Sequence, residues 1–300
     1  MEQVVIFKKN HVWCQISKKK RDGKFGAITL LLPFILMIIM FQILPLLTVA
    51  EGSLRQDGMS TYSFYNYIYI FKNKFFRQSI INSLEISFYS TIIGLIIAFQ
   101  GAYSISKLNG KVRKRILLLS NMTSNFSGLP LAFAFIVLLG TNGVLTIILR
   151  RAGLVDGFDI YSKAGLTLVY IYFQISLGIL LLYPSFDMIR EEWYEAASIL
   201  GATKFEFWRK IALPVLLPSV LGTGILLFAN AMGAYATTYG LVLSNYNVIP
   251  IRIGSLVSGD IFLKPNLAGA LAIVMTLILT FIITVNELLI KNGRRRNGKK

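Results

Sequence analysis

The chain has 300 residues, of which 55% are hydrophobic and 15% are charged, and its mean hydropathy is +0.63. This composition excludes an ordinary soluble globular protein and predicts an integral membrane protein. The net charge is +17, and the basic residues cluster between apolar runs, without a basic stretch interleaved with aromatic residues. This arrangement favours cytoplasmic loops facing anionic lipid and argues against a nucleic-acid partner.

The N-terminal tail, residues 1–24, is basic, with seven Lys and Arg against two acids. It contains the single histidine, His11, and the single cysteine, Cys14. A lone cysteine excludes an intramolecular disulfide, and one His with one Cys supplies too few ligands for a metal site. We therefore expect a solvated tail and no bound metal.

Six apolar runs follow, each long enough to cross a bilayer, which takes about 20 helical residues. The first run is longer than the core of a cleaved signal peptide and no A-x-A-like site follows it, so we predict a span there as well. The predicted fold is an all-α integral membrane protein with one transmembrane domain, 25–290, between basic tails at 1–24 and 291–300. The expected spans are about 25–50, 79–106, 116–140, 164–186, 215–242 and 266–290.

The distribution of basic residues predicts the orientation of these spans. Six spans place both termini on one side, and that side carries 22 of the 31 Lys and Arg, against nine on the other. Basic loops stay in the cytoplasm. We therefore expect both termini and the loop between the fourth and fifth spans, 187–214, to be cytoplasmic.

The fifth expected span has an unusually polar middle, with Asn230, Tyr235, Thr237, Thr238 and Tyr239. Such side chains are costly in a membrane unless they face protein or water. Two interpretations follow: hydrogen bonds between helices, or the wall of a polar pathway. The glycines and alanines among them would allow local unwinding or close packing.

Glu85 lies near the outer end of the second expected span. An intramembrane carboxylate either pairs with a base or lines a path for cations. The first alternative would use Arg77 or a residue of a neighbouring span, and the second would place Glu85 in a solute pathway.

The sequence contains no motif for catalysis. No phosphate-binding loop, H-E-x-x-H, G-x-S-x-G or Cys/His cluster is present. With its one histidine in a tail, the chain is predicted to be no enzyme.

The stretch 187–218 carries five acids and four bases between two apolar spans, yet keeps apolar residues at helical spacing. A helix with one polar and one aromatic face should lie at the membrane surface or dock in a partner. Its central sequence is Glu195-Ala196-Ala197, then Gly201-Ala202, then Leu213-Pro214.

This spacing resembles the EAA loop of binding-protein-dependent ABC importer permeases, the MetI-like transmembrane family. Asn82-Ser83-Leu84 and Ala102-Tyr103, at the two ends of the second span, extend the resemblance, which covers about residues 79–290. It implies a MetI-like permease in a bacterial plasma membrane. ATP and Mg would be used by a partner chain.

The resemblance also implies a coupling helix, from Glu195 to Phe205, that inserts into a groove on an ABC ATPase subunit. Small side chains would permit close approach, and Gly201 would permit a turn with positive φ after the helix. The Glu195 carboxylate would accept backbone hydrogen bonds or pair with a base. The expected coupling residues are Glu195, Ala196, Ala197, Gly201, Ala202 and Phe205.

Further partners implied by the resemblance are a second permease subunit, usually a sister chain in a heterodimer, and an extracytoplasmic solute-binding protein. The segment 229–240 is similar to the spermidine/putrescine-type subgroup, which implies a polyamine or a related small solute. Glu85 and Asp260 are the acids available for a cation, although the basic outer loops suit an anionic solute or an acidic binding protein equally well. A stand-alone channel or carrier, and a membrane enzyme or sensor, are the alternative functions.

Overall fold

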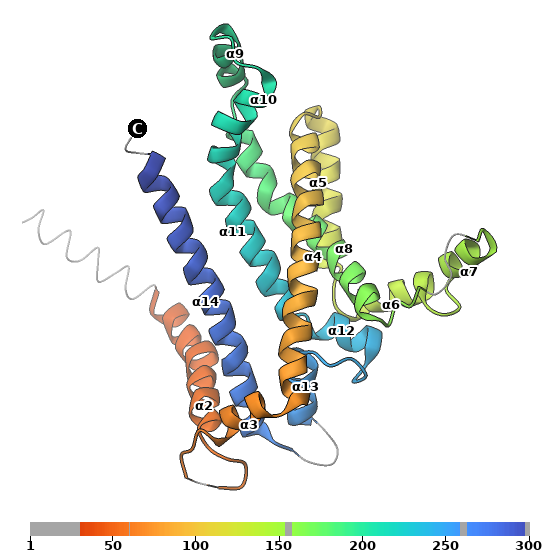
Figure 1. Ribbon diagram of the computed structural model, residues 1–300, viewed down its shortest axis with the longest axis vertical. Helices are drawn as coiled ribbons and strands as arrows, with labels where there is room; N and C mark the ends of the chain where they lie inside the picture. Colours follow the sequence, from red (N-terminus) through yellow and green to blue (C-terminus); the bar gives the residue numbers. More distant parts are fainter. Residues whose placement is uncertain (1–30, 60, 154–157, 259–262, 298–300) are drawn as a thin grey trace, which may run out of the picture.

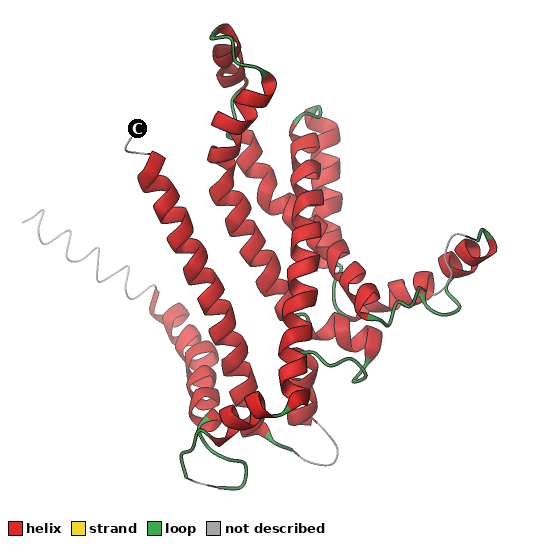
Figure 2. Ribbon diagram, in the orientation of Figure 1, coloured by secondary structure: helices red, strands yellow, loops and turns green. Residues whose placement is uncertain are grey.

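The computed structural model describes residues 31–59, 61–153, 158–258 and 263–297. For residues 289 and 292–297 it describes the backbone only. The predicted N-terminal tail, 1–24, and Asp260 lie outside these residues. Within them the chain is helical, and its only extended pairing is an isolated bridge between Arg55 and Tyr62 (Figure 2). The helices are η1 Ile39–Ile43, α2 Leu44–Ser53, α3 Tyr65–Lys72, α4 Lys74–Ser106, α5 Gly110–Asn125, α6 Leu129–Leu139, α7 Val144–Arg151, α8 Lys163–Asp187, α9 Glu191–Ile199, α10 Lys204–Phe207, η2 Trp208–Ala212, α11 Leu213–Met232, α12 Tyr235–Val242, α13 Ile249–Ser258 and α14 Pro265–Asn297.

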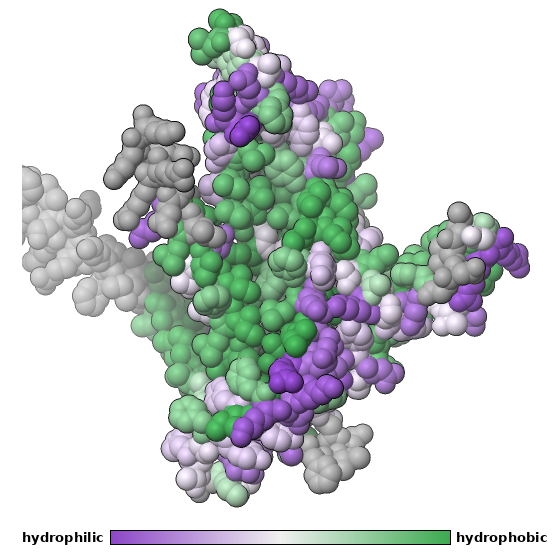
Figure 3. Space-filling model, in the orientation of Figure 1, coloured by the Kyte–Doolittle hydropathy of each residue, from purple (hydrophilic) through white to green (hydrophobic). Residues whose placement is uncertain are grey.

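Six helical segments among the described residues are long and apolar enough to span a membrane, which confirms the predicted all-α membrane fold. Apolar side chains cover the middle of the bundle, and hydrophilic residues gather at the α9 end and at the tip of α7 (Figure 3). The six segments are Leu31–Ser53, Lys74–Ser106, Leu129–Arg151, Lys163–Asp187, Lys204–Met232 and Pro265–Leu288.

Two of the expected spans are not continuous helices in the structure. The span expected at 116–140 is divided into α5 and α6, because Gly128 has φ +75° and Pro130 stands in the first turn of the helix that follows. The span expected at 215–242 is divided into α11 and α12 at Gly233 and Ala234. The connection expected at 243–265 contains an additional helix, α13.

The bundle is built on α4 and α8, which share the most extensive packing in the described fold. Helix α11 packs against both, α5 packs on α8, and α14 packs on α2 at the other side (Figure 1). Small residues bring α4 and α8 together: a Cβ on Gly178 would lie 2.7 Å from the Cβ of Ala98. Close backbone approach of this kind is what holds membrane helices together, since lipid offers no hydrophobic drive for association.

The face of α4 that packs inward is polar. Gln174 of α8 is fully buried and donates from Nε2 to the Ser90 hydroxyl at 2.9 Å. Small polar residues of this kind let membrane helices approach closely and hydrogen-bond to each other. The buried hydroxyl residues of α4 are Ser79, Ser83, Ser87, Ser90 and Thr91.

The beginning of α4 also fixes the loop before α13. The Asn82 side-chain amide donates to the Asn247 carbonyl at 2.8 Å, and the Ser83 hydroxyl accepts from the Ile249 N–H at 2.9 Å. Asn247 in turn donates to the Phe75 carbonyl at 2.7 Å. Backbone that leaves helical geometry inside a membrane protein needs such partners.

Both π-helical segments directly precede a Leu-Pro pair. Segment η1 ends before Leu44-Pro45, and η2 ends before Leu213-Pro214. Proline has no N–H and its ring clashes with the carbonyl four residues earlier. A π turn widens the helix at that point, so the helix continues through the proline.

We predict opposite effects of alanine at two helical glycines. Gly178→Ala should lower stability by about 1–3 kcal/mol, because the new methyl group overlaps Ala98. Gly222→Ala in α11 should leave stability unchanged or raise it by up to about 1 kcal/mol, because a Cβ there meets nothing within 4 Å. Thermal unfolding of the purified chain in one detergent measures both. Equal melting temperatures for the two variants would contradict the close packing of α4 on α8.

Candidate coupling surface and solute-facing segment

Helix α9 projects beyond the end of the bundle, between α8 and α11 (Figure 1). Glu191 and Glu192 occupy its first turn, where negative charge favours the helix dipole. Gly201 follows the helix with φ +80°, as expected for a glycine that closes it. A Cβ at Gly201 would meet nothing within 4 Å, so the glycine is required by backbone conformation and not by space. The expected single helix from Glu195 to Phe205 is therefore two helices, α9 and α10, separated by this turn.

Helix α10 begins with a capping box. The Thr203 hydroxyl accepts from the Glu206 N–H at 3.3 Å, and the Glu206 carboxylate accepts from the Thr203 N–H at 3.0 Å. Lys210 donates to the same carboxylate at 3.0 Å. A four-residue helix has little stability of its own, and these reciprocal bonds fix its start.

The expected coupling residues face in two directions. Glu195, Ala196, Gly201 and Phe205 are exposed, with Phe205 70% accessible. Ala197 is 7% accessible and packs inward with Phe207 and Ala212, so its small size serves contact within this chain.

Two further expected coupling residues, Ala202 and Glu195, differ from what the sequence led us to expect. Ala202 is half-buried beside the inward cluster that contains Ala197. Glu195 makes no hydrogen bond or ion pair with any described residue, so its expected intramolecular partner is absent from that part of the chain. Its carboxylate is free to meet another molecule.

The most exposed apolar side chains of this region were missed in the sequence. Ile199 and Leu200 are 86% and 87% accessible, at the end of α9 and just before Gly201. With Glu195, Ala196 and Phe205 they form a surface that we call the coupling surface. The signal in the sequence was a pair of large apolar residues directly before the glycine that ends the helix.

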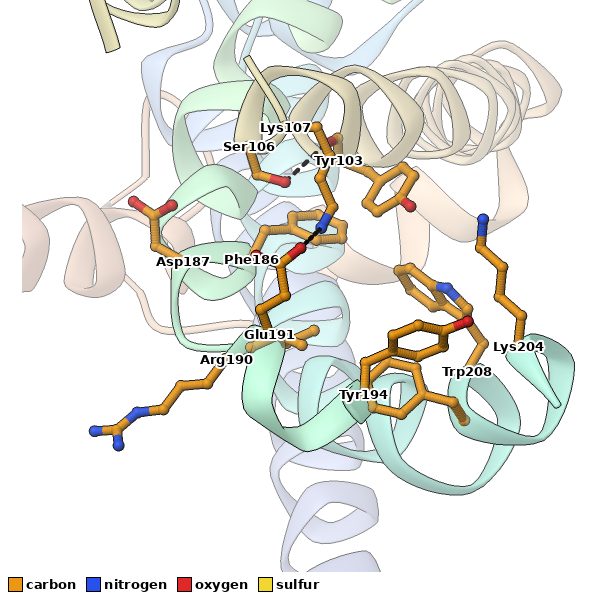
Figure 4. A pocket seen from close by; sticks show the side chains of 12 residues that line it. Tyr103, Ser106, Lys107, Phe186, Asp187, Arg190, Glu191, Tyr194, Lys204 and Trp208 are labelled. Carbon is orange, nitrogen blue, oxygen red and sulfur yellow. Dashed lines mark hydrogen bonds and ion pairs between the residues drawn. The ribbon is translucent and has the colours of Figure 1, made fainter. Parts of the chain in front are cut away.

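A cavity of about 430 Å³ lies between the α9–α10 unit and the ends of α4 and α8 (Figure 4). Its aromatic wall includes Tyr103, Phe186 and Trp208, with the Tyr103 and Trp208 rings 5.1 Å apart and nearly perpendicular. Lys107 and Glu191 form an ion pair across it at 3.8 Å. Through these contacts the α9–α10 unit is attached to the ends of two spanning helices.

At the break between α11 and α12, two of the expected pathway residues face the interior. The buried Thr237 hydroxyl accepts from the Gly128 N–H at 2.9 Å. The buried Thr238 hydroxyl donates to the Ala234 carbonyl at 2.6 Å and lies 2.5 Å from the Tyr170 hydroxyl. These two threonines make the interhelical contacts that were one of the two interpretations, and they line no exposed wall.

The other three residues of that set are on the surface. Asn230 is exposed at the end of α11, and Tyr235 and Tyr239 are each 39% accessible on α12. Their rings are stacked, with centroids 5.5 Å apart and planes 19° apart. This part of the segment presents aromatic faces and hydrogen-bonding groups outward.

Glu85 forms an ion pair with Lys163 at the start of α8. Of the alternatives for Glu85, the structure therefore favours pairing, with a partner on a neighbouring span and not with Arg77. A carboxylate held by a lysine is a poor ligand for a cationic solute.

Within the described residues, no three His, Cys, Asp or Glu side chains lie close enough together to hold a metal ion.

Residues 90–296 match the family described as binding-protein-dependent transport system inner membrane component. The chain belongs to this family. It is therefore the membrane permease subunit of an ABC importer, in which the ATPase is a separate subunit. This membership places the chain in the inner membrane as a multi-pass protein.

Relatives of this permease are named for different solutes. It is 26% identical over 272 residues to the spermidine/putrescine transport system permease protein PotB of Haemophilus influenzae, covering 88% of this chain and 93% of that one. It is 27% identical over 257 residues to the trehalose transport system permease protein SugB of Mycobacterium tuberculosis, covering 84% and 87%. Similarity of sequence therefore does not determine the solute.

Solved structures show the same fold. A chain of a bacterial alginate ABC transporter, in complex with a periplasmic protein bound to an alginate pentasaccharide, has a TM-score of 0.71 at 20% identity, covering 89% of this permease and 93% of that chain. A chain of the MetNI methionine ABC transporter has a TM-score of 0.54 at 14% identity, covering 72% and 94%.

We predict that Thr237→Val destabilises the permease by about 1–3 kcal/mol. The change keeps the shape of the side chain but leaves the partly buried Gly128 N–H without its acceptor. Thr276→Val is the matched control, because Thr276 is exposed and its hydroxyl bonds only to the Ala272 carbonyl of its own helix. Thermal unfolding in detergent compares the two. A Thr237 variant as stable as the Thr276 variant would show that this bond is dispensable.

Proposed function

We propose that this permease subunit binds its ATPase partner through the coupling surface at α9 and the Gly201 turn. The observation that carries the proposal is the pair Ile199 and Leu200, which expose nearly all of their apolar area at the tip of the molecule. Exposed apolar side chains rimmed by charged residues are typical of a protein interface. The Glu195 carboxylate, which has no partner among the described residues, supplies a polar contact at the same surface.

The region behind this surface supports a role in transmission. The π-helical segment η2 joins α10 to α11 without a loop, so α10, η2 and α11 continue as one helical segment, Lys204–Met232. The Lys107–Glu191 pair and the aromatic contacts of Trp208 tie the same unit to α4. A displacement of α9 by ATP-driven closure of the ATPase would therefore be passed to the spans, so that the pathway alternates between outward and inward access.

The other partners follow from the kind of importer. We propose an extracytoplasmic solute-binding protein that delivers the solute, a second permease subunit, as a sister chain, that completes the pathway, and ATP with Mg at the ATPase. The excess of basic residues on the α9 side supports the expected orientation, with both termini and the coupling surface in the cytoplasm.

Two solute classes are candidates, because relatives named for polyamines and for a disaccharide match the chain about equally well. A polyamine, the solute expected from the sequence, needs carboxylates or aromatic rings to meet its ammonium groups. A sugar needs stacking faces and neutral hydrogen-bonding groups. The two solute classes therefore require different residues in the pathway.

We predict that Leu200→Asp weakens binding of the ATPase subunit about thirtyfold. Burial of a leucine side chain contributes roughly 2 kcal/mol, and 1.4 kcal/mol corresponds to a tenfold change in affinity. Glu195→Lys should weaken binding as well, and Gly201→Asp should disturb the turn at φ +80°. Copurification of the ATPase with the tagged permease, followed by ATP hydrolysis of the complex, measures each effect.

The matched control is Met59→Asp, which places the same charge on an exposed apolar residue outside the coupling surface, in the loop after α2. Met59→Asp should copurify with the ATPase as the unchanged chain does. Normal assembly and uptake by the Leu200, Glu195 and Gly201 variants would refute the proposed surface.

A further inference from the structure

The cavity beside the α9–α10 unit lies where three spanning segments end. The segments Lys74–Ser106 and Lys163–Asp187 stop at its wall, and Lys204–Met232 begins there. Apolar side chains cover the bundle on one side of this level, and hydrophilic residues gather on the other side, at the α9 end (Figure 3). Tyrosine and tryptophan side chains, which line the cavity, are enriched at the level of lipid headgroups. The cavity therefore lies at the boundary of the membrane.

An open groove of about 410 Å³ adjoins this cavity, because Tyr103 and Trp208 line both. The rest of the groove is lined by Phe99, Gln100 and Ser104 of α4. Phe99 lies seven residues before the last residue of α4, which is about 10 Å along the helix axis. The groove thus leads from the membrane boundary toward the level of the lipid chains.

Two lysines stand about one helical turn beyond the two aromatic rings. Lys107 follows Tyr103 by four residues at the end of α4, and Lys204 precedes Trp208 by four residues at the start of α10. In Figure 4 the two rings lie between the amino ends of these lysines, whereas the third base of the lining, Arg190, points away. Ammonium groups of lysine bind phosphate as point charges.

Two carboxylates also line the cavity, and neither neutralises Lys204. Asp187 pairs with Arg113 at 3.4 Å. Glu191 pairs with Lys107 at 3.8 Å, but their side chains are 81% and 60% exposed, so water screens this pair. Lys204 forms no ion pair with a described residue. The two lysines can therefore meet an anion that comes from outside the chain.

We propose that the cavity and the groove bind one acidic phospholipid from the leaflet at the α9 end. The lipid phosphate lies between the ammonium groups of Lys107 and Lys204. Its glycerol and ester groups lie beside Tyr103 and Trp208, and one acyl chain lies along Phe99. The site is apolar, then aromatic, then cationic, which matches the order of chains, esters and phosphate in such a lipid. A lipid bound here contacts α4 and α10 at once, so it fastens the α9–α10 unit to the bundle.

The test is a lipid titration of the purified full-length chain in one detergent, with bound lipid counted by native mass spectrometry. The probes are dioleoyl phosphatidylglycerol, dioleoyl phosphatidylcholine, which has no net charge, and glycerophosphoglycerol, which is the first lipid without its chains. We expect one phosphatidylglycerol to bind about tenfold or more tightly than phosphatidylcholine, because each lysine near an acidic lipid contributes about fivefold. Glycerophosphoglycerol should bind much more weakly than the complete lipid.

Three substitutions test the two parts of the site. Lys107→Gln and Lys204→Gln should each lower the affinity for phosphatidylglycerol about fivefold and leave the affinity for phosphatidylcholine unchanged. Ser104→Phe fills the groove from an exposed position. It should lower the affinity for both lipids, because the new ring takes the place of the acyl chain.

Matched controls separate this site from charge in general and from damage to the α9–α10 unit. Lys111→Gln and Lys114→Gln remove the same charge from exposed positions of α5 outside the cavity lining, and should leave both affinities within about twofold. Glu191→Gln breaks the same ion pair as Lys107→Gln. It should leave the affinity for phosphatidylglycerol equal or higher, because Lys107 keeps its charge.

The opposite results overturn the proposal. Equal affinities for the two lipids, or losses in the Lys111 and Lys114 variants as large as those in the Lys107 and Lys204 variants, would mean that no specific site exists here. Glycerophosphoglycerol that binds as tightly as the lipid, or lipid binding unaffected by Ser104→Phe, would mean that a soluble anion occupies the cavity. None of these measurements involves the ATPase, so the proposed function is tested separately by copurification.

Discussion

The hydrogen bond from the Gly128 N–H to the Thr237 hydroxyl joins the two points at which the spanning segments break. In lipid, every backbone group that leaves a helix needs a partner supplied by the protein. Gly128 begins the turn to α6, and Thr237 stands in the first turn of α12, so the bond links the two interrupted segments to each other. Close packing of Gly240 on Leu129 and Ala132 supports the same contact between α6 and α12.

The polar residues of the interior have a consistent arrangement around these breaks. Asn82 and Ser83 hold the backbone before α13, and Tyr170 holds the turn before α12. Side chains with hydroxyl and amide groups thus replace the hydrogen bonds that a continuous helix would make for itself. The apolar contacts, led by Gly178 on Ala98, bring the helices close enough for these short polar side chains to reach.

The coupling surface lies at one end of a long helical segment, and the break before α12 lies at its other end. Residues Lys204–Met232 run without a loop from the α10 cap to the break before α12, a distance of roughly 40 Å at the rise of an α-helix. The π turn at Trp208–Ala212 lets this segment pass Pro214. A movement of the ATPase partner at one end therefore has a continuous helical path to the break between α11 and α12.

The sequence by itself determined the class of the protein, the number of spans and the function as an importer permease. Each spanning segment must be apolar along its own length, because polar groups are unfavourable in lipid. Spans can therefore be recognised one at a time from hydrophobic runs in the sequence. The EAA pattern was readable because its residues are neighbours in the chain, and the turn at Gly201 followed from local backbone rules alone.

Only the tertiary structure decided which way each side chain faces and where the helices break. Ala197 faces its own protein, whereas Ile199 and Leu200 are exposed, because Phe207 and Ala212 return to cover one face of α9. Thr237 and Tyr235 are two residues apart, yet one is buried against Gly128 and the other is exposed over Gly254. Glu85 pairs with Lys163, which lies 78 residues away on another helix. The direction of each side chain and the ion pair of Glu85 depend on contacts between distant segments. A local pattern in the sequence therefore cannot predict them.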